Sequence, residues 1–145
     1  MSQANVDLVT QLQPAPDVDI AELFRNDDMW SAAADAIAPL FHPDFESVPP
    51  GVPATERVHV GLDGLRAAWR EWLKPWLTYR TEIKQALDAG DRVLLLTQDY
   101  GRHEGTAQEV KLDGSAVWRI RDGKIARAEF FPERSEAFKA AGLEE

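Results

Sequence analysis

The sequence predicts an α+β fold, in which a mainly helical first half is followed by an antiparallel sheet. Apolar residues recur at helical spacing between residues 20 and 41 and again between 65 and 73. Between residues 78 and 131, segments in which apolar and polar residues alternate, as is typical of strands, are separated by short turn sequences. The length of 145 residues, with 44% hydrophobic and 28% charged residues, fits one buried core. Helices that are separate from an antiparallel sheet are typical of the α+β class.

The N-terminal residues show the weakest periodicity of apolar residues in the chain. Residues 1–18 are polar, contain Pro14 and Pro16, and show no convincing period. We therefore expect a flexible N-terminal arm over residues 1–18 and a single domain over residues 19–145.

Two helices are expected next. Asp19 followed by Glu22 has the spacing of a capping box, with Asp19 as the cap. Asn26-Asp27-Asp28 interrupts this helix and can cap another one. The apolar positions of the second helix extend over residues 30–41, and Pro43 ends the run.

A strand pair and a third helix follow. Residues 45–48 predict a short strand that ends at Pro49-Pro50-Gly51, and residues 57–60 alternate like a second strand. A helix then begins between Gly61 and Gly64, with Pro75 marking its end or a kink. Its apolar stripe consists of large side chains: Leu65, Trp69, Trp72, Leu73 and Trp76.

The last part of the chain predicts an antiparallel meander and one more helix. Strands are expected over residues 78–87, 93–103, 109–121 and 124–131. A C-terminal helix over residues 133–141 follows Pro132, and Gly142 ends it.

The register of the last hairpin follows from its turn. Arg121-Asp122-Gly123 suits a three-residue loop that pairs Ile120 with Lys124, so that Trp118 would oppose Ala126 and Ala116 would oppose Ala128. One face is then apolar and is expected to line the core or a pocket: Ala116, Trp118, Ile120, Ala126, Ala128 and Phe130. The other face is mixed and suits solvent or a dimer contact: Val117, Arg119, Ile125, Arg127 and Glu129.

Charge excludes several classes of partner. The net charge is −9, and residues 1–64 carry all of that imbalance. Because no basic stripe is present, neither nucleic acid nor an anionic membrane surface is an expected partner. No apolar run approaches the roughly 20 residues that span a bilayer, and the N-terminus does not resemble a secretory signal. We expect a cytoplasmic protein whose partner is a hydrophobic small molecule.

Two local motifs carry a family resemblance. The first is Leu40-Phe41-His42-Pro43-Asp44-Phe45-Glu46, and the second is Ala116-Val117-Trp118-Arg119-Ile120-Arg121-Asp122-Gly123-Lys124-Ile125. In this order they resemble the SnoaL-like branch of the nuclear transport factor 2-like superfamily, over roughly residues 19–143. The resemblance implies a curved sheet wrapped on N-terminal helices into a cone with one apolar pocket, and a homodimer formed through the sheet. It also implies isomerase, cyclase, dehydratase or epoxide hydrolase activity, or binding alone.

The family's best-known catalytic residues are largely missing. The two carboxylates of ketosteroid isomerases fall on Pro49 and Ala116, and no tyrosine precedes Tyr79. Of the three epoxide hydrolase groups, two fall on Phe130 and Thr97, and only Asp99 matches. Neither activity is therefore expected.

Asp99 is the candidate catalytic residue. Asp99, Thr97 and Leu95 are spaced two residues apart, so their side chains lie on the same face of the strand, which should face the pocket. There Asp99 could act as an acid–base group. The alternative is a solvated carboxylate paired with Arg102. The expected pocket residues are Trp30, Trp69, Trp72, Leu95, Thr97, Ala116, Trp118, Ala128 and Phe130. Two classes stay open: a lyase, isomerase or cyclase, and a non-catalytic ligand-binding or dimerisation module.

Metal and cofactor chemistry has no sequence support. The chain has no cysteine, and His42, His59 and His103 are far apart in sequence. His42 could cap a helix or touch the pocket mouth, His59 is expected to pack within a strand, and His103 could lie near Asp99. No phosphate-binding loop or dinucleotide motif occurs. We expect neither a metal nor a cofactor.

Overall fold

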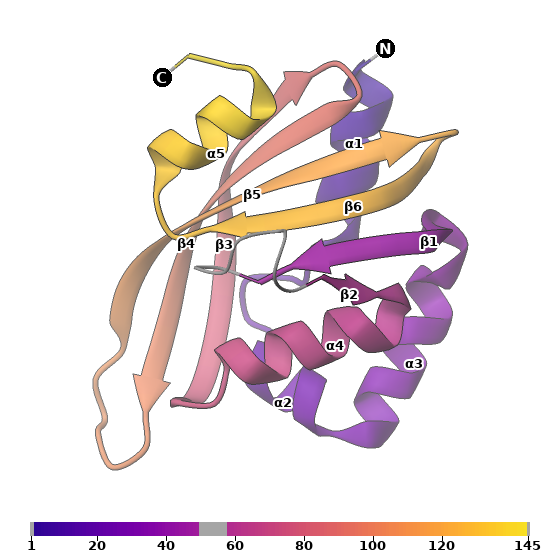
Figure 1. Ribbon diagram of the computed structural model, residues 1–145. Coiled ribbons are helices and arrows are strands. Elements are labelled where there is room, and N and C mark those ends of the chain that lie inside the picture. The colour runs from indigo at the N-terminus through magenta and orange to yellow at the C-terminus, as the bar shows by residue number, and fades with distance from the viewer. Residues whose placement is uncertain (1, 50–57, 145) are drawn as a thin grey trace.

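A computed structural model describes residues 2–49 and 58–144 and shows a curved, unclosed sheet of six strands (Figure 1). The strand order is β2-β1-β6-β5-β4-β3. The bounds are β1 Phe41–Val48, β2 His59–Val60, β3 Trp76–Ala89, β4 Arg92–His103, β5 Val110–Arg121 and β6 Lys124–Phe131. All neighbouring pairs are antiparallel except β1 and β6, which are parallel. The predicted α+β class is confirmed.

The helices form from local signals that the sequence contains. They are α1 Ser2–Leu12, α2 Ile20–Arg25, α3 Asp27–Ile37, α4 Gly61–Trp72 and α5 Arg134–Ala141, with a 3₁₀ turn at Ala38–Leu40. The Asp19 side chain accepts from the backbone N–H of Ala21, and that of Asn26 accepts from Met29. Gly142 ends α5 with a φ of 76°. Among the described residues, no helix has the length and apolar character needed to cross a bilayer.

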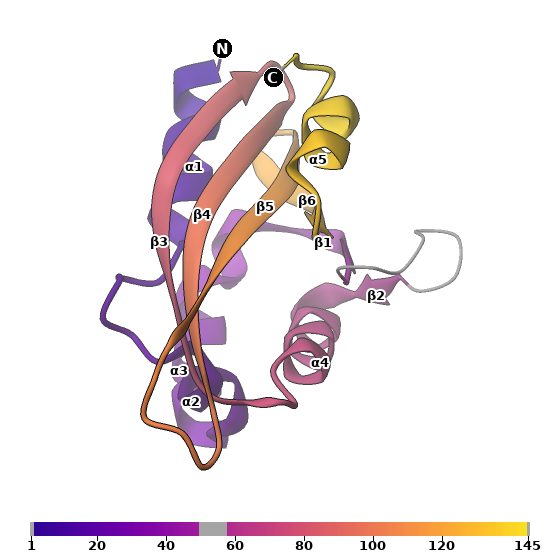
Figure 2. The same ribbon diagram turned by 90° about the vertical axis from the view of Figure 1, so that its left-hand side faces the viewer.

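The sheet packs on different elements on its two faces. The inner cluster joins α1–α4 to one face of the strands, through residues such as Phe24, Trp30 and Leu95. The outer cluster joins α5 to the other face through Leu94, Leu96, Val117, Ala137 and Ala141. Figure 2 shows α1 and α5 on opposite sides of the upper part of the sheet.

The expected flexible arm is partly wrong, because residues 2–12 form α1. Val9 is fully buried in the inner cluster, and Val6 and Leu12 pack against it from the same helix face. Asn5 also donates a hydrogen bond to the Gly90 carbonyl at the β3–β4 turn. The helix is stabilised by these contacts with the sheet rather than by any strong local signal.

The register of the last hairpin also differs from the prediction. Asp122 and Gly123 both have positive φ, 56° and 76°, and form a two-residue turn that pairs Arg121 with Lys124. A bulge at Ala126 follows, so that Trp118 lies opposite Ala128, not Ala126. Ala116 accordingly pairs with Phe130. The two-residue turn pairs Ile125 with Ile120, so Ile125 lies in the inner cluster and not on the predicted mixed face.

Two further predictions need correction. Trp76 is not on α4, which ends at Trp72; it begins β3. Val117 is buried beneath α5 and Ile125 in the inner core, so neither can contribute to a dimer contact on the outer face. Arg127 is half-buried and is paired with Glu46. A homodimer through the rest of the sheet and a cytoplasmic location stay predictions.

Candidate functional site

A cavity of about 590 Å³ lies between α2–α4 and the inner face of β3–β6. This volume is in the range of roughly 300–1,000 Å³ that holds drug-sized ligands. The segment after α1 also contributes to its wall, through Gln13, Pro14 and Val18. The cavity exists because the bulged, curved strands leave the inner face concave while the helices pack around its rim.

Aromatic rings in mutual contact form most of one wall. Trp69 on α4 stacks on Phe24 at 5.5 Å and 5°, and Phe24 in turn contacts Trp30 at 5.2 Å. Trp69 also meets Phe130 edge-to-face at 5.5 Å and Tyr79 at 6.1 Å. The spacing of Leu65, Ala68, Trp69 and Trp72 directs one face of α4 toward the cavity.

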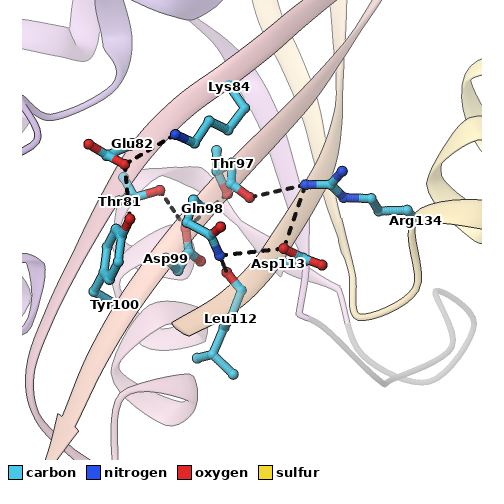
Figure 3. Close-up of polar contacts among 10 residues, drawn as sticks. All are labelled: Thr81, Glu82, Lys84, Thr97, Gln98, Asp99, Tyr100, Leu112, Asp113 and Arg134. Atoms are coloured by element: carbon cyan, nitrogen blue, oxygen red, sulfur yellow. Dashed lines mark hydrogen bonds and ion pairs between the residues drawn. The ribbon is translucent and has the colours of Figure 1, made fainter. Parts of the chain in front are cut away.

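A buried carboxylate lies at the polar part of this wall. Asp99 on β4 is only 8% exposed and lines the cavity. The Tyr79 hydroxyl donates to its Oδ2 at 2.7 Å, and the Thr81 and Thr97 hydroxyls donate to its Oδ1 at 2.5 and 2.9 Å. Figure 3 shows the contact with Thr81, which is paired directly with Asp99 across β3 and β4. Arg102 is not a partner of Asp99, because it donates to the Thr106 carbonyl.

Tyr79 is a neutral hydrogen-bond donor at this site. Burial raises the pKa of Tyr79 well above its usual value, and the adjacent Asp99 carboxylate raises it further. The Trp72 side chain acts in the opposite direction on the same pKa, through a hydrogen bond, but its effect is smaller. The phenol therefore stays protonated over the whole physiological range.

Gly114 leaves the space that the carboxylate cluster needs. It pairs with Thr97 across β4 and β5, and it lines the cavity. A Cβ at this position would collide with the Thr97 hydroxyl and lie 3.0 Å from Asp99 Oδ2. Any larger residue would therefore displace Thr97 or Asp99.

Further polar contacts near the cluster involve residues on β4, β5 and α5. Gln98 Nε2 donates to the Leu112 carbonyl at 2.9 Å (Figure 3). Arg134 contacts the Thr97 carbonyl at 3.5 Å and Asp113 at 3.8 Å. These contacts fix β5 and α5 to the edge of the site.

Most of the predicted pocket residues line the cavity. They are Trp30, Trp69, Trp72, Leu95, Thr97, Ala116, Trp118 and Phe130, together with Asp99. Ala128 does not line it: this residue is fully buried in the inner core, opposite Trp118, because the two-residue turn and the bulge together shift the register by two residues.

Sequence reasoning missed Tyr79, Thr81 and Gly114. Tyr79 and Thr81 are two residues apart on β3, the strand that pairs with β4, so the sequence does indicate that their side chains lie on the same face. Their contact with Asp99 also required the β3–β4 register, and that depends on a bulge between Ile83 and Gln85.

One buried donor in the cavity wall lacks a partner within the described part of the chain. Trp118 lines the cavity and is 4% exposed, and its indole N–H makes no hydrogen bond. Leaving a buried donor unpaired costs about 1–3 kcal/mol, which an acceptor atom of a ligand could recover.

The histidines do not join Asp99. His103 stacks on Trp76 at 4.2 Å, and its Nδ1 is 2.9 Å from the Pro75 carbonyl. His42 accepts from the backbone N–H of Asp44 near the protein surface. His59 pairs with Ser47 between β2 and β1. Within residues 2–49 and 58–144, no three carboxylate or imidazole groups converge in the manner of a metal site.

Solved structures of the same fold support this architecture. A protein assigned to the SnoaL-like polyketide cyclases, from Jannaschia sp. CCS1, superposes with a TM-score of 0.63 at 16% identity, covering 99% of this chain and 95% of that one. TerC, co-crystallised with polyporic acid, gives 0.63 at 19% identity, covering 96% and 98%. A protein with a ketosteroid isomerase-like fold from Catenulispora acidiphila DSM 44928, in complex with trimethylamine, gives 0.54 at 18%, covering 91% and 95%.

At these identities, the structural matches establish the fold alone. No curated protein matches the sequence. A family model, that of the SnoaL-like domain, matches residues 20–128, which span the helices α2–α4 and nearly all of the sheet. This protein therefore belongs to the SnoaL-like domain family.

Proposed function

We propose that this protein binds a hydrophobic small molecule in the cavity and that Asp99 acts on it as the acid–base residue of an isomerase, lyase or cyclase reaction. The observation that carries the proposal is the position of Asp99, a buried carboxylate in the wall of a mainly apolar cavity. Buried carboxylates are rare unless they are paired, and in a cleft they are candidates for chemistry.

The cavity supplies both binding energy and orientation. Its aromatic wall removes apolar ligand surface from water, at roughly 25 cal/mol per Å². Trp118 offers a donor to a ligand oxygen, and Asp99 offers an acceptor at a different point of the wall. Two polar anchors in an apolar pocket are the usual means of fixing a ligand's orientation. The complexes of two fold relatives with polyporic acid and with trimethylamine support binding of small organic molecules.

The hydrogen bonds around Asp99 suit it to the role of a base. A carboxylate can accept about four hydrogen bonds. Tyr79, Thr81 and Thr97 occupy three of these sites, two on Oδ1 and one on Oδ2. Oδ2 can therefore accept one further proton, from an acidic C–H or O–H group of the ligand. The three hydroxyls hold the carboxylate in one orientation, which removes the cost of ordering it during the reaction.

The second candidate function is binding without catalysis. It is favoured by the saturation of Asp99 Oδ1 with two hydroxyl donors, an arrangement that also serves to satisfy a buried polar residue. In that case, Asp99 and Tyr79 would recognise a polar group of the ligand without changing it.

Asp99→Asn separates these two functions. A ligand retained through purification would first be identified by native mass spectrometry, and its conversion would then be followed with wild type and variant. We expect turnover to fall by ~10²–10⁴-fold, well beyond any loss of ligand affinity, since one positioned proton-transfer group contributes about this much. Asp35→Asn, which removes the same charge from the exposed side of α3, is the control. Turnover by Asp99→Asn close to the wild-type rate would contradict the catalytic role.

A further inference from the structure

The charge of the cavity wall is unbalanced. Among the described residues, no lysine, arginine or histidine lines the cavity, whereas the buried Asp99 and the more exposed Asp113 do. The hydrogen bonds to the Asp99 carboxylate come from the neutral hydroxyls of Tyr79, Thr81 and Thr97. Hydroxyl donors satisfy its lone pairs, but they do not neutralise a negative charge.

Other carboxylates of the protein are neutralised by direct contact with arginine. Glu46 is 2.7 Å from Arg127, and Asp27 is 2.8 Å from Arg66. These carboxylates are far more exposed than Asp99, and an exposed carboxylate needs a cationic partner least. The most deeply buried of these acidic groups is thus the one without a cation, and it faces a cavity.

The aromatic wall next to Asp99 is also suited to a positive charge. Tyr79 donates to Asp99 and contacts Trp69 edge-to-face, and Trp69 continues the wall to Phe24 and Phe130. Aromatic faces attract cations through their quadrupole, most strongly where water is excluded. Arg66 lies over Trp30 at 5.9 Å, but it is already paired with Asp27.

We propose that the ligand of this cavity is an organic cation, a hydrophobic amine or quaternary ammonium compound. Its charged nitrogen lies between Asp99 and the Tyr79–Trp69 aromatic wall, and its apolar body extends along Phe24 and Phe130. This proposal rests on the proposed function for its site and specifies the chemical class of the ligand. The net charge of −9 acts in the same direction, because it raises the local concentration of cations around the protein.

A comparison of two isosteric ligands tests this proposal on the wild-type protein. Phenyltrimethylammonium and tert-butylbenzene have the same shape and differ in a positively charged nitrogen in place of a carbon. A purely apolar cavity would favour tert-butylbenzene, because the ammonium group loses hydration on entry. Asp99 with the aromatic wall should reverse this order, and we expect the cation to bind at least ~10-fold more tightly. Quenching of the tryptophans in the cavity wall, checked by calorimetry, measures both affinities.

Two variants assign the preference to Asp99. In Asp99→Asn, the ratio of the two affinities should fall to about one or reverse, while tert-butylbenzene binds as in wild type. In Asp35→Asn, which reduces the net negative charge by the same amount but at an exposed position, the wild-type ratio should persist. Circular dichroism verifies that both variants are folded, and the wild-type comparison stands even if Asp99→Asn does not fold.

The outcomes separate this proposal from the proposed function. If wild type binds tert-butylbenzene as tightly as the cation or more tightly, the cavity binds hydrophobic molecules but the cation proposal is wrong. If the preference persists in Asp99→Asn, Asp99 is not its source and the proposal is equally wrong. If neither ligand binds, the cation proposal fails, and larger hydrophobic ligands then decide whether the cavity binds small molecules at all.

Discussion

Along β4, alternate side chains enter two different environments. Leu94 and Leu96 point to the outer face, where α5 covers them in a closely packed cluster with Ala137 and Ala141. Leu95, Thr97 and Asp99 point to the inner face, which surrounds a cavity of about 590 Å³. The two faces of one strand therefore differ: the outer face is closely packed, and the inner face borders open space. The comparison predicts that similar substitutions have different effects on the two faces.

Truncation on the filled face should have the largest effect. Leu94→Ala removes a fully buried side chain from the cluster beneath α5, and we expect the free energy of unfolding to fall by about 2–5 kcal/mol. Leu95→Ala is the matched control. Leu95 already borders open space on one side and loses fewer contacts, so its loss should lie at the lower end of the same range. Urea denaturation measures both, and an equal or larger loss for Leu95→Ala would contradict the comparison.

Enlargement should also destabilise the filled outer face more than the face that borders the cavity. Ala137→Leu inserts extra volume between α5 and the sheet, where the alanine is fully buried, and should cost about 1–3 kcal/mol. Ala116→Leu projects into the cavity, so its effect on stability should be small, but it should reduce the space for ligand. Thermal unfolding together with ligand binding tests this pair. Strong destabilisation by Ala116→Leu would show that the inner face has no room to spare.

The sequence predicted what depends on local chemistry. The caps at Asp19 and Asn26, the end of α5 at Gly142 and the strand parity of Asp99 are all properties of a few neighbouring residues. The family resemblance supplied the cone-shaped sheet, which local patterns do not specify.

The errors concern contacts between distant segments. Nothing in the residues of α1 signals that Val9 will be buried against the sheet. The bulge at Ala126 determines which of the residues that follow it face inward, but bulges are set by the curvature of the whole sheet. The burial of Val117 depends on where α5 docks. Tyr79 could be associated with Asp99 only after the β3–β4 register was known.

The smallest predicted effect concerns the polar end of the cavity at high pH. Burial and Asp99 raise the pKa of Tyr79 in the folded protein above the value of about 10 that it has in the unfolded chain. The corresponding stability is complete below pH ~10. It is lost as the pH rises further, because only the unfolded chain then releases the phenolic proton, at up to about 1.4 kcal/mol per pH unit. Tyr79→Phe should remove this contribution, so that its unfolding free energy falls less steeply above pH ~10 than that of wild type. Thr81→Val also deprives Asp99 of a hydroxyl donor. Because this variant retains Tyr79 and the threonine hydroxyl does not ionise in this pH range, it should keep the wild-type slope. Denaturation curves at several pH values between 8 and 11 measure these slopes, and parallel slopes for wild type and Tyr79→Phe would show that the phenol ionises as readily in the cavity wall as in water.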